Sequence, residues 1–214
     1  MVNSMSKKFD ALLFDLDGTL WYACHTIAKG WNETFAHFSL DLKVNAKDIE
    51  SVAGHPFSQC VQALFPEKDL SVYPQFVQTL SCYEKKHMDK EGGLLYPGVK
   101  ENLEKLSKDY KLYIVSNCST WYLEMFLNFP ALNLKKCFVD WDCFGLSSIS
   151  KSSMITNMIK SHKLKNPVYI GDTRGDELAA KEANVPFIHA SYGYGVLPHV
   201  TNKISCFEDL LLFE

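Results

Sequence analysis

The chain has 214 residues, of which 47% are hydrophobic and 22% are charged, and its formal net charge is −3. These values are ordinary for a soluble globular protein and exclude a fibrous or disordered chain. The slight acidity, with no basic run longer than a lysine pair, argues against a nucleic-acid partner. No apolar segment reaches the length of a membrane span and residues 1–8 lack a signal-peptide core, so we expect a cytoplasmic protein without a membrane partner.

The seven cysteines are odd in number and form neither a C-x-x-C pair nor a Cys/His metal spacing. This pattern predicts free buried thiols in a reducing compartment. Cys118 lies beside a candidate site residue, but burial is the usual fate of a cysteine, so we do not expect a catalytic thiol.

The first predicted element is a strand at residues 11–14, which is apolar throughout and therefore typical of a strand buried on both faces of a parallel sheet. Asp15 and Asp17 follow it, and Gly18 allows a sharp turn. Parallel sheets bind ligands beyond the carboxyl ends of their strands. Two carboxylates about 4 Å apart repel each other by roughly 4 kcal/mol at an effective dielectric near 20, so the pair favours a shared proton or a cation such as Mg²⁺.

The next segment, residues 21–94, has no strong strand run and carries helical patterns, which lie at residues 27–38, 56–64 and 73–88. Gly92-Gly93 and Pro97-Gly98 punctuate its end. We therefore predict two domains, a core of residues 1–20 and 95–214 and a helical insertion of residues 21–94.

The remainder of the chain alternates between strand and helix patterns. Apolar runs predict three further strands, at residues 113–115, 168–170 and 186–189. Helical spacing predicts helices at residues 97–110 and 151–162 and a helix that includes residues 179–180. This alternation predicts an α/β fold with a Rossmann-like parallel sheet at its core.

Polar residues follow two of these later strands. Asp172 and Asp176 add two carboxylates to the first pair, and such a set of oxygen donors suits Mg²⁺, although acidic residues are also common at an ordinary helix start. Ser116 and Asn117 can donate hydrogen bonds to a phosphoryl oxygen or can cap a helix. Lys151 can balance the charge of a phosphate or lie on the surface.

Taken together, these residues resemble the haloacid dehalogenase (HAD) superfamily, in its phosphoglycolate-phosphatase-like branch with a helical C1 cap inserted after the first motif. Asp15-Leu16-Asp17-Gly18-Thr19-Leu20 resembles the first motif, and Gly171-Asp172-Thr173 through Asp176 resembles the fourth. Ser116 and Lys151 correspond by position to the second and third motifs. Tyr192-Gly193-Tyr194-Gly195 is similar to the aromatic-glycine stretch that follows the last core strands.

The chain departs from the family pattern at two places. Ser152 stands where a proline commonly follows the lysine, and Tyr22-Ala23 stands where many relatives have an acidic residue and a serine. In the insertion, Gly54-His55-Pro56 resembles the glycine-x-proline specificity loop, so His55 can reach toward the substrate. A surface loop histidine is the alternative.

The resemblance implies a Mg²⁺-dependent phosphatase that hydrolyses a small phosphomonoester through a phosphoaspartate. In this assignment Asp15 is the nucleophile and Asp17 is the general acid and base. The Mg²⁺ ligands are Asp15, the backbone carbonyl of Asp17 and Asp172, with Asp176 in support. The groups that hold the phosphoryl oxygens and the substrate are Ser116, Lys151, Asn117, Gly18, Thr19 and His55.

Three other activities stay open. A 2-haloacid dehalogenase uses the same nucleophile without a metal, but relatives with that activity lack the second aspartate, so Asp17 argues against it. A phosphosugar mutase would differ in the cap. A regulatory module that binds Mg²⁺ and phosphate without catalysis is the third, although receiver domains of this class are about half as long and have no helical insertion. The substrate is open among phosphoglycolate, a sugar phosphate, a nucleotide and pyrophosphate, and we expect a monomer or a weak dimer.

Overall fold

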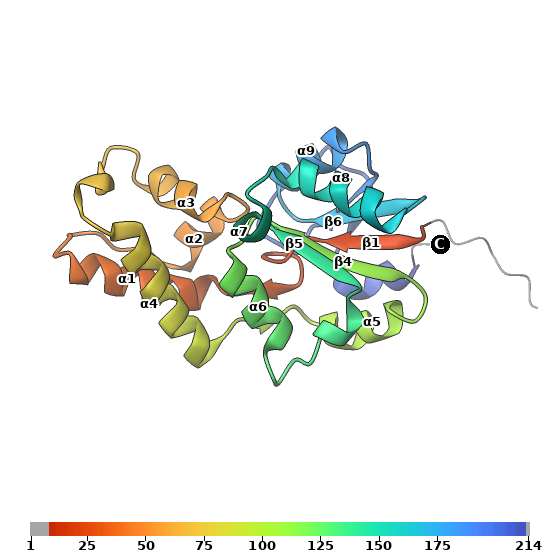
Figure 1. Cartoon of the computed structure of the whole chain (residues 1–214), viewed down its shortest axis with the longest axis horizontal. Coiled ribbons are helices and arrows are strands. Elements are labelled where there is room, and N and C mark those ends of the chain that lie inside the picture. The colour runs from red at the N-terminus through yellow and green to blue at the C-terminus, as the bar shows by residue number, and fades with distance from the viewer. Residues whose placement is uncertain (1–8, 213–214) are drawn as a thin grey trace, which may run out of the picture.

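A six-stranded sheet forms the centre of the protein in the computed structural model, which describes residues 9–212 (Figure 1). Its order is β5-β4-β1-β6-β7-β8, and every neighbouring pair is parallel. The strands are β1 (Ala11–Phe14), β4 (Lys111–Ser116), β5 (Asp140–Cys143), β6 (Pro167–Gly171), β7 (Phe187–Ala190) and β8 (Lys203–Ile204). The predicted α/β fold with a parallel core is therefore confirmed, and β1 lies between β4 and β6.

Both faces of β1 are buried, which explains why the strand is apolar throughout. Leu12 and Phe14 pack into one cluster with side chains of α5 (Val99–Leu106) and α6 (Thr120–Asn128). Leu13, which points to the opposite face, packs into another cluster with side chains of α8 and α9. The other elements of this part are α7 (Phe144–Ser147), α8 (Lys151–His162), α9 (Arg174–Glu182) and the 3₁₀ helices η2 (Lys135–Cys137) and η3 (Phe207–Leu212).

The helices between β1 and β4 have a hydrophobic cluster of their own and lie to the left of the sheet in Figure 1. They are α1 (Cys24–His37), α2 (Ala46–Val52), α3 (Phe57–Leu64), the 3₁₀ helix η1 (Leu70–Val72) and α4 (Phe76–Glu91). Helices α1 and α4 cross closely at Gly30, where an added Cβ would lie 2.6 Å from the Cα of Glu84. Glycine at this position lets the two backbones meet, so it fixes where Glu84 sits.

A short ribbon joins the insertion to the sheet-containing part. Strand β2 (Trp21–Tyr22) pairs antiparallel with β3 (Leu94–Leu95), so that Trp21 lies opposite Leu95. The predicted boundaries at 20/21 and 94/95 fall on this ribbon. The division of the chain into two domains stays a prediction.

Several elements differ from the expected ones. Helix α8 has the predicted bounds, whereas α5 covers residues 99–106 of the predicted 97–110. The sequence pattern did not predict α2, a seven-residue helix that begins with a capping box between Asn45 and Asp48. It also missed β5, whose sequence Asp-Trp-Asp-Cys is partly polar because the strand lies at an edge of the sheet.

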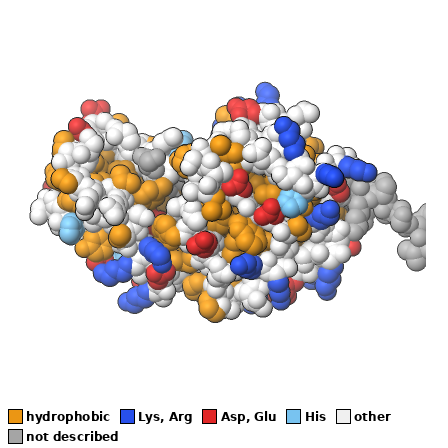
Figure 2. Space-filling model, viewed as in Figure 1, with side chains coloured by type: hydrophobic (Ala, Val, Ile, Leu, Met, Phe, Trp, Pro, Cys, Tyr) orange, Lys and Arg blue, Asp and Glu red, His pale blue; other side chains and the backbone are white. Residues whose placement is uncertain are grey.

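The surface and the cysteines agree only in part with the expectations. All seven cysteines are free, but Cys82 and Cys206 are exposed, so the prediction of buried thiols is wrong for these two. Lysine and arginine side chains lie at separate places on the face shown in Figure 2. Within residues 9–212, the helices lack the combination of length and apolar character that a bilayer crossing needs.

Candidate active site

Three adjacent strands deliver polar side chains to the same edge of the sheet. Asp15 follows β1, Ser116 ends β4 and Asp172 follows β6, and all three side chains are buried. The backbone N–H of Asp15 donates to the carbonyl oxygen of Ile170 at 2.8 Å, so the β1–β6 pairing extends through Asp15 and holds its backbone in place. This arrangement follows from the strand order, because parallel neighbours end at one edge.

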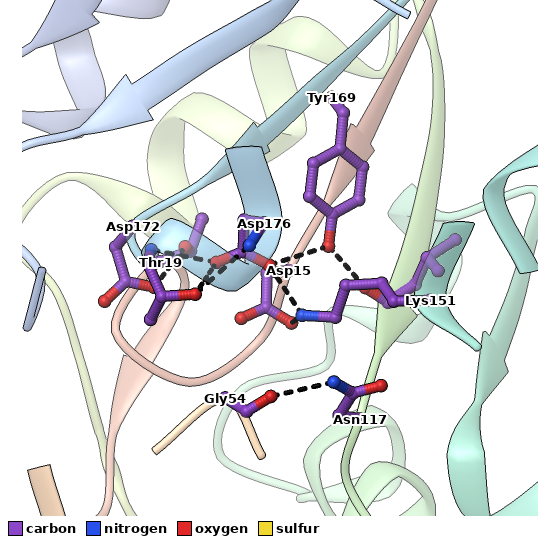
Figure 3. A network of polar contacts seen from close by, with 10 residues as sticks. Asp15, Thr19, Gly54, Asn117, Lys151, Tyr169, Asp172 and Asp176 are labelled. Carbon is purple, nitrogen blue, oxygen red and sulfur yellow. Dashed lines mark hydrogen bonds and ion pairs between the residues drawn. The ribbon is translucent and has the colours of Figure 1, made fainter. Parts of the chain in front are cut away.

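Three of the four predicted carboxylates meet at this edge (Figure 3). Oxygen atoms of Asp15, Asp172 and Asp176 lie within 4.8 Å of one another, and all three residues are buried. The carboxyl group of Asp17 is not part of this group. It accepts a hydrogen bond from the hydroxyl of Tyr122 at 2.5 Å instead.

Lys151 lies in the same cluster, as predicted from its position in the chain. Its ammonium group contacts Asp15 Oδ1 at 2.9 Å and Asp176 Oδ1 at 2.6 Å. The side chain is buried, which excludes the alternative of a surface lysine. It is the first residue of α8, whose start is fixed by Ser150, since the Ser150 side chain accepts a hydrogen bond from the backbone N–H of Ser153.

Asp176 lies in the first turn of a helix. It therefore belongs both to the acidic cluster and to a helix start, the two roles that the sequence predicted for it. Its Oδ2 accepts hydrogen bonds from the backbone N–H and the hydroxyl of Thr173, which completes the capping box of α9. Its Oδ1 accepts from Lys151 and from the hydroxyl of Tyr169 at 3.3 Å. Both oxygens therefore have protein partners, an arrangement suited to holding Lys151 and the start of α9.

Asp172 lies against the turn that follows β1. It accepts a hydrogen bond from the hydroxyl of Thr19 at 3.2 Å and another from the backbone N–H of Tyr194 at 2.7 Å. Gly18 has a φ of 78°, and a Cβ there would lie 2.1 Å from Asp172 Oδ2, so no other residue fits. Gly18 and Thr19 thus shape the surroundings of Asp172, and their predicted contact with the substrate stays a prediction.

The protonation states of these acids follow from burial and from their unequal access to Lys151. Burial raises the pKa of Asp15 to about 6, although Lys151 opposes this shift. Burial and the nearby carboxylates of Asp176 and Asp15 raise the pKa of Asp172 well above its ordinary value. Burial alone would also raise the pKa of Asp176, but Lys151 and the hydrogen bonds from Thr173 hold it below its ordinary value.

Asp17 differs from the other acids because its carboxyl group lies outside their cluster and accepts a hydrogen bond from a tyrosine hydroxyl. Burial raises its pKa to about 7, and the hydrogen bond from Tyr122 limits this rise. A carboxyl group with such a pKa can give up and take back a proton near neutral pH.

A small cavity of about 80 Å³ lies between this edge of the sheet and the insertion. Asp15, Asp17, Ser116 and Asn117 line it from the sheet side. The insertion contributes residues of α1, α2, α3 and α4 and of the loop at residues 53–55, among them the exposed His55. The two sides are joined by a hydrogen bond of 2.7 Å from the Asn117 side chain to the carbonyl oxygen of Gly54 (Figure 3).

Several residues of the site had no role assigned from the sequence, among them Tyr122, Tyr169, Tyr194 and Glu84. Tyr194 belongs to the aromatic-glycine stretch, but nothing in that stretch indicates that its backbone N–H contacts Asp172. Tyr122 and Glu84 lie within helices whose patterns carry no signal for a site.

Comparison with known proteins agrees with this geometry. Residues 12–190 match the family described as haloacid dehalogenase-like hydrolase. A phosphoglycolate phosphatase from Agrobacterium fabrum is 26% identical over 200 residues, which cover 88% of this chain and 83% of the relative. The pyrophosphatase PpaX from Listeria monocytogenes is 29% identical over 187 residues, which cover 84% of this chain and 82% of the relative.

The fold is shared with solved structures. A crystal structure described as a predicted phosphoglycolate phosphatase from Haemophilus somnus superposes with a TM-score of 0.83 at 22% identity, covering 97% of this chain and 98% of that one. The family match spans far more than half of the sequence and includes Asp15, Ser116, Lys151, Asp172 and Asp176. The chain therefore belongs to the haloacid dehalogenase-like hydrolase family.

Proposed function

We propose that this protein is a Mg²⁺-dependent phosphatase that hydrolyses a small phosphomonoester through a phosphoaspartate on Asp15. The observation that carries the proposal is that Asp15 and Asp17 line one small cavity while Asp15 also belongs to the buried cluster with Asp172, Asp176 and Lys151. The relatives named as phosphatases and as a pyrophosphatase support the same reaction class.

The donors present fit Mg²⁺. They are oxygen atoms only and they are buried. Burial chiefly, and the neighbouring carboxylates in addition, raise the pKa values of Asp15 and Asp172, so a divalent cation would stabilise their ionised forms. Asp15 and Asp172 would hold the ion together with the backbone carbonyl of Asp17, and Asp176 would support them through Lys151 and α9. When bound, Mg²⁺ neutralises charge on the phosphoryl group.

The reaction proceeds in two displacements. A carboxylate oxygen of Asp15 attacks phosphorus, and the bond from phosphorus to the alcohol oxygen breaks while protonated Asp17 gives its proton to that oxygen. Ionised Asp17 then takes a proton from a water molecule, whose oxygen attacks phosphorus and frees Asp15 together with inorganic phosphate. The pKa of about 7 allows Asp17 to serve in both directions.

The other polar groups position the phosphoryl oxygens. Ser116 and Asn117 line the cavity and offer donors, while Lys151 balances charge beside Asp15. Residues 21–94 act in this proposal as a cap that closes over the site. The small size of the cavity then favours a small metabolite over a phosphoprotein.

The proposal is tested by measuring phosphate release from a panel of small phosphomonoesters, with Mg²⁺ and with excess chelator. We expect release that depends on Mg²⁺ and is inhibited by Ca²⁺, whose larger and looser coordination disturbs the geometry. Borohydride reduction during turnover should mark Asp15, which mass spectrometry of its peptide detects. Full phosphate release in chelator would overturn the Mg²⁺ dependence, and halide release from a 2-haloacid without phosphate release would favour a dehalogenase. Transfer of phosphate between positions of a sugar without net release would favour a mutase, and binding of Mg²⁺ and phosphate without turnover would favour a regulatory module.

A further inference from the structure

One buried acid on the insertion side of the cavity has no part in the proposed chemistry. Glu84 lies on α4, is 5% exposed and lines the same cavity as Asp15 and Asp17. Its Oε2 accepts a hydrogen bond from the indole N–H of Trp31 at 2.9 Å. Its Oε1 accepts none from residues 9–212, so this oxygen is available to a molecule in the cavity.

The position of Glu84 is fixed on both sides. Gly30 lies against its backbone, and the adjacent Trp31 binds its carboxyl group. Trp31 in turn packs edge-on against Phe57, with ring centroids 6.4 Å apart. Burial of a carboxyl group with one hydrogen-bonded oxygen costs free energy, so a hydrogen-bond donor in the cavity would stabilise Glu84.

The remainder of the wall carries little positive charge. Among the described residues that line the cavity there is no lysine or arginine, and the one basic side chain is that of His55. The wall contributed by the insertion is otherwise mostly apolar, and includes Ile27, Ile49 and Val52. A leaving group with a carboxylate or a second phosphate would therefore meet Glu84 and apolar side chains without a lysine or arginine to pair with it.

We propose that Glu84, held by Trp31, selects phosphomonoesters whose alcohol part ends in a hydrogen-bond donor, a hydroxyl or an ammonium group, and disfavours those with a second anionic group. The inference rests on the proposed phosphatase function and names its substrate class. It separates this chain from an enzyme for phosphoglycolate or pyrophosphate, the substrates that the names of two of its relatives indicate.

The electrostatics of Glu84 agree with this assignment. Burial raises its pKa to about 8, against the hydrogen bond from Trp31, and the charge of Asp17 adds to the rise. Near neutral pH the group can accept a hydrogen bond from a substrate hydroxyl, or it can ionise against an ammonium group. The ionised form repels an anion, and the neutral form offers it one O–H donor but no positive charge to balance it.

The test compares kcat/KM for four substrates with the wild-type protein and Mg²⁺: ethanolamine phosphate, glycerol phosphate, phosphoglycolate and pyrophosphate. We expect at least one of the first two to exceed both of the others by about tenfold or more, the size of one hydrogen bond to a charged group. Preference for ethanolamine phosphate would identify the donor as an ammonium group, and preference for glycerol phosphate would identify it as a hydroxyl.

Two variants connect the preference to this side chain. Glu84→Gln keeps a neutral donor and acceptor, so it should lower kcat/KM for the ammonium substrate by about tenfold and for the hydroxyl substrate by less than about threefold. Glu84→Leu removes both functions and should bring the ratio between either donor substrate and phosphoglycolate close to one. Glu91→Gln is the matched control, since this exposed acid of the same helix pairs with Lys29, and its ratios should equal those of the wild type.

The outcomes separate the inference from the proposed function. Phosphate release that is fastest from phosphoglycolate or pyrophosphate would overturn the inference and leave the phosphatase intact, and loss of that activity in His55→Ala would identify His55 as the anion-binding group. Unchanged ratios in both Glu84 variants with wild-type melting curves would also overturn it. No release from any substrate, with no mark on Asp15, would overturn the proposed function itself.

Discussion

The two sides of the cavity differ in the side chains that line them, since one side is rich in charged groups and the other is mostly apolar. On the sheet side, Asp15 and Asp176 form ion pairs with the ammonium group of Lys151, and the neighbouring Asp172 accepts a hydrogen bond from Thr19. On the insertion side, the wall is mostly apolar and has one deeply buried acid, Glu84. Charged side chains are concentrated where the phosphoryl group would lie. Apolar side chains form most of the wall where the remainder of the substrate would lie.

This contrast predicts two classes of variant. Changes on the sheet side should lower activity toward every substrate, because all share the phosphoryl group. Changes on the insertion side should alter activity unequally among substrates, because only the leaving group differs. The following predictions test this division, from the largest expected effect to the smallest.

Replacement of the nucleophile should have the largest effect. Asp15→Asn keeps the size of the side chain but removes the attacking carboxylate, so hydrolysis of every substrate should fall by at least about 1,000-fold. Phosphate release and the melting temperature are measured together, since a folded and inactive variant is expected. A variant that keeps a tenth of the wild-type kcat would exclude Asp15 as the nucleophile.

Asp17→Asn should lower kcat by about 10²- to 10⁴-fold, the usual size of a proton-transfer contribution. Mg²⁺ affinity should stay near that of the wild type, because the proposed contact uses the backbone carbonyl. The pH profile gives an independent check, since burial raises the pKa of Asp17 to about 7. Activity that depends on ionised Asp17 should rise through this pH, and activity that depends on its protonated form should fall through it. Normal turnover in the variant would remove the acid–base role.

Asp172→Ala should weaken Mg²⁺ binding more than Asp176→Ala does. For Asp176→Ala, the loss of a residue that supports the ligands, the affinity should fall by about 10- to 100-fold. The reason is that both oxygens of Asp176 already have protein partners, among them Thr173 and Lys151. Asp176→Ala should instead lower the free energy of unfolding by about 3 kcal/mol, because it breaks a buried ion pair and a helix cap. Calorimetric Mg²⁺ titration and chemical denaturation measure the two effects. The reverse order of affinities would exchange the roles of the two residues.

Glu84→Gln should change how stability depends on pH. The pKa of Glu84 is raised from 4.5 to about 8 in the folded protein, so the folded state retains a proton that the unfolded chain loses above its ordinary pKa. The wild-type free energy of unfolding should therefore decrease relative to the variant as the pH rises from about 5 to about 8, and level off beyond. Denaturation at several pH values measures this difference. Parallel curves for the two proteins would show that Glu84 is ionised throughout.

His55→Ala should have the smallest effect, a change of a few fold in kcat/KM that differs among substrates, because this residue lines the cavity but is exposed. Mg²⁺ affinity should be unaffected, since His55 lies outside the acidic cluster. An equal loss on all substrates, or none on any, would show that it does not contribute to specificity.

The sequence predicted best the features that short-range patterns encode. The apolar run of β1 and the helical spacing of α8 gave their elements nearly to the residue. Strand β5 was missed because its four residues, Asp-Trp-Asp-Cys, form no continuous apolar run, and an edge position tolerates its aspartates. Helix α2 was missed because its capping box stabilises a segment too short to show a clear period.

Some residues of the site could be predicted from the sequence and others could not. The polar residues at strand ends could be gathered from the sequence because parallel strands bring their carboxyl ends together, which is how Asp15, Ser116 and Asp172 were found, whereas Lys151 was found from its position relative to the family's third motif. Tyr122 and Glu84 could not be predicted from the sequence. Tyr122 lies 105 residues from Asp17 along the chain, and Glu84 contacts Trp31 because two helices cross. Such contacts depend on helix packing, which no local pattern specifies.

The ribbon of β2 and β3 has a consequence for how this fold can diversify. Because Trp21 pairs with Leu95, the chain leaves the sheet-containing part and returns to it at nearly the same point, after more than seventy residues. Insertions are tolerated best where their two ends lie close together. A different helical segment could therefore be grafted onto this ribbon without moving any strand of the six-stranded sheet, so that evolution or design can exchange the residues proposed to select the substrate and leave Asp15 and its neighbours unchanged.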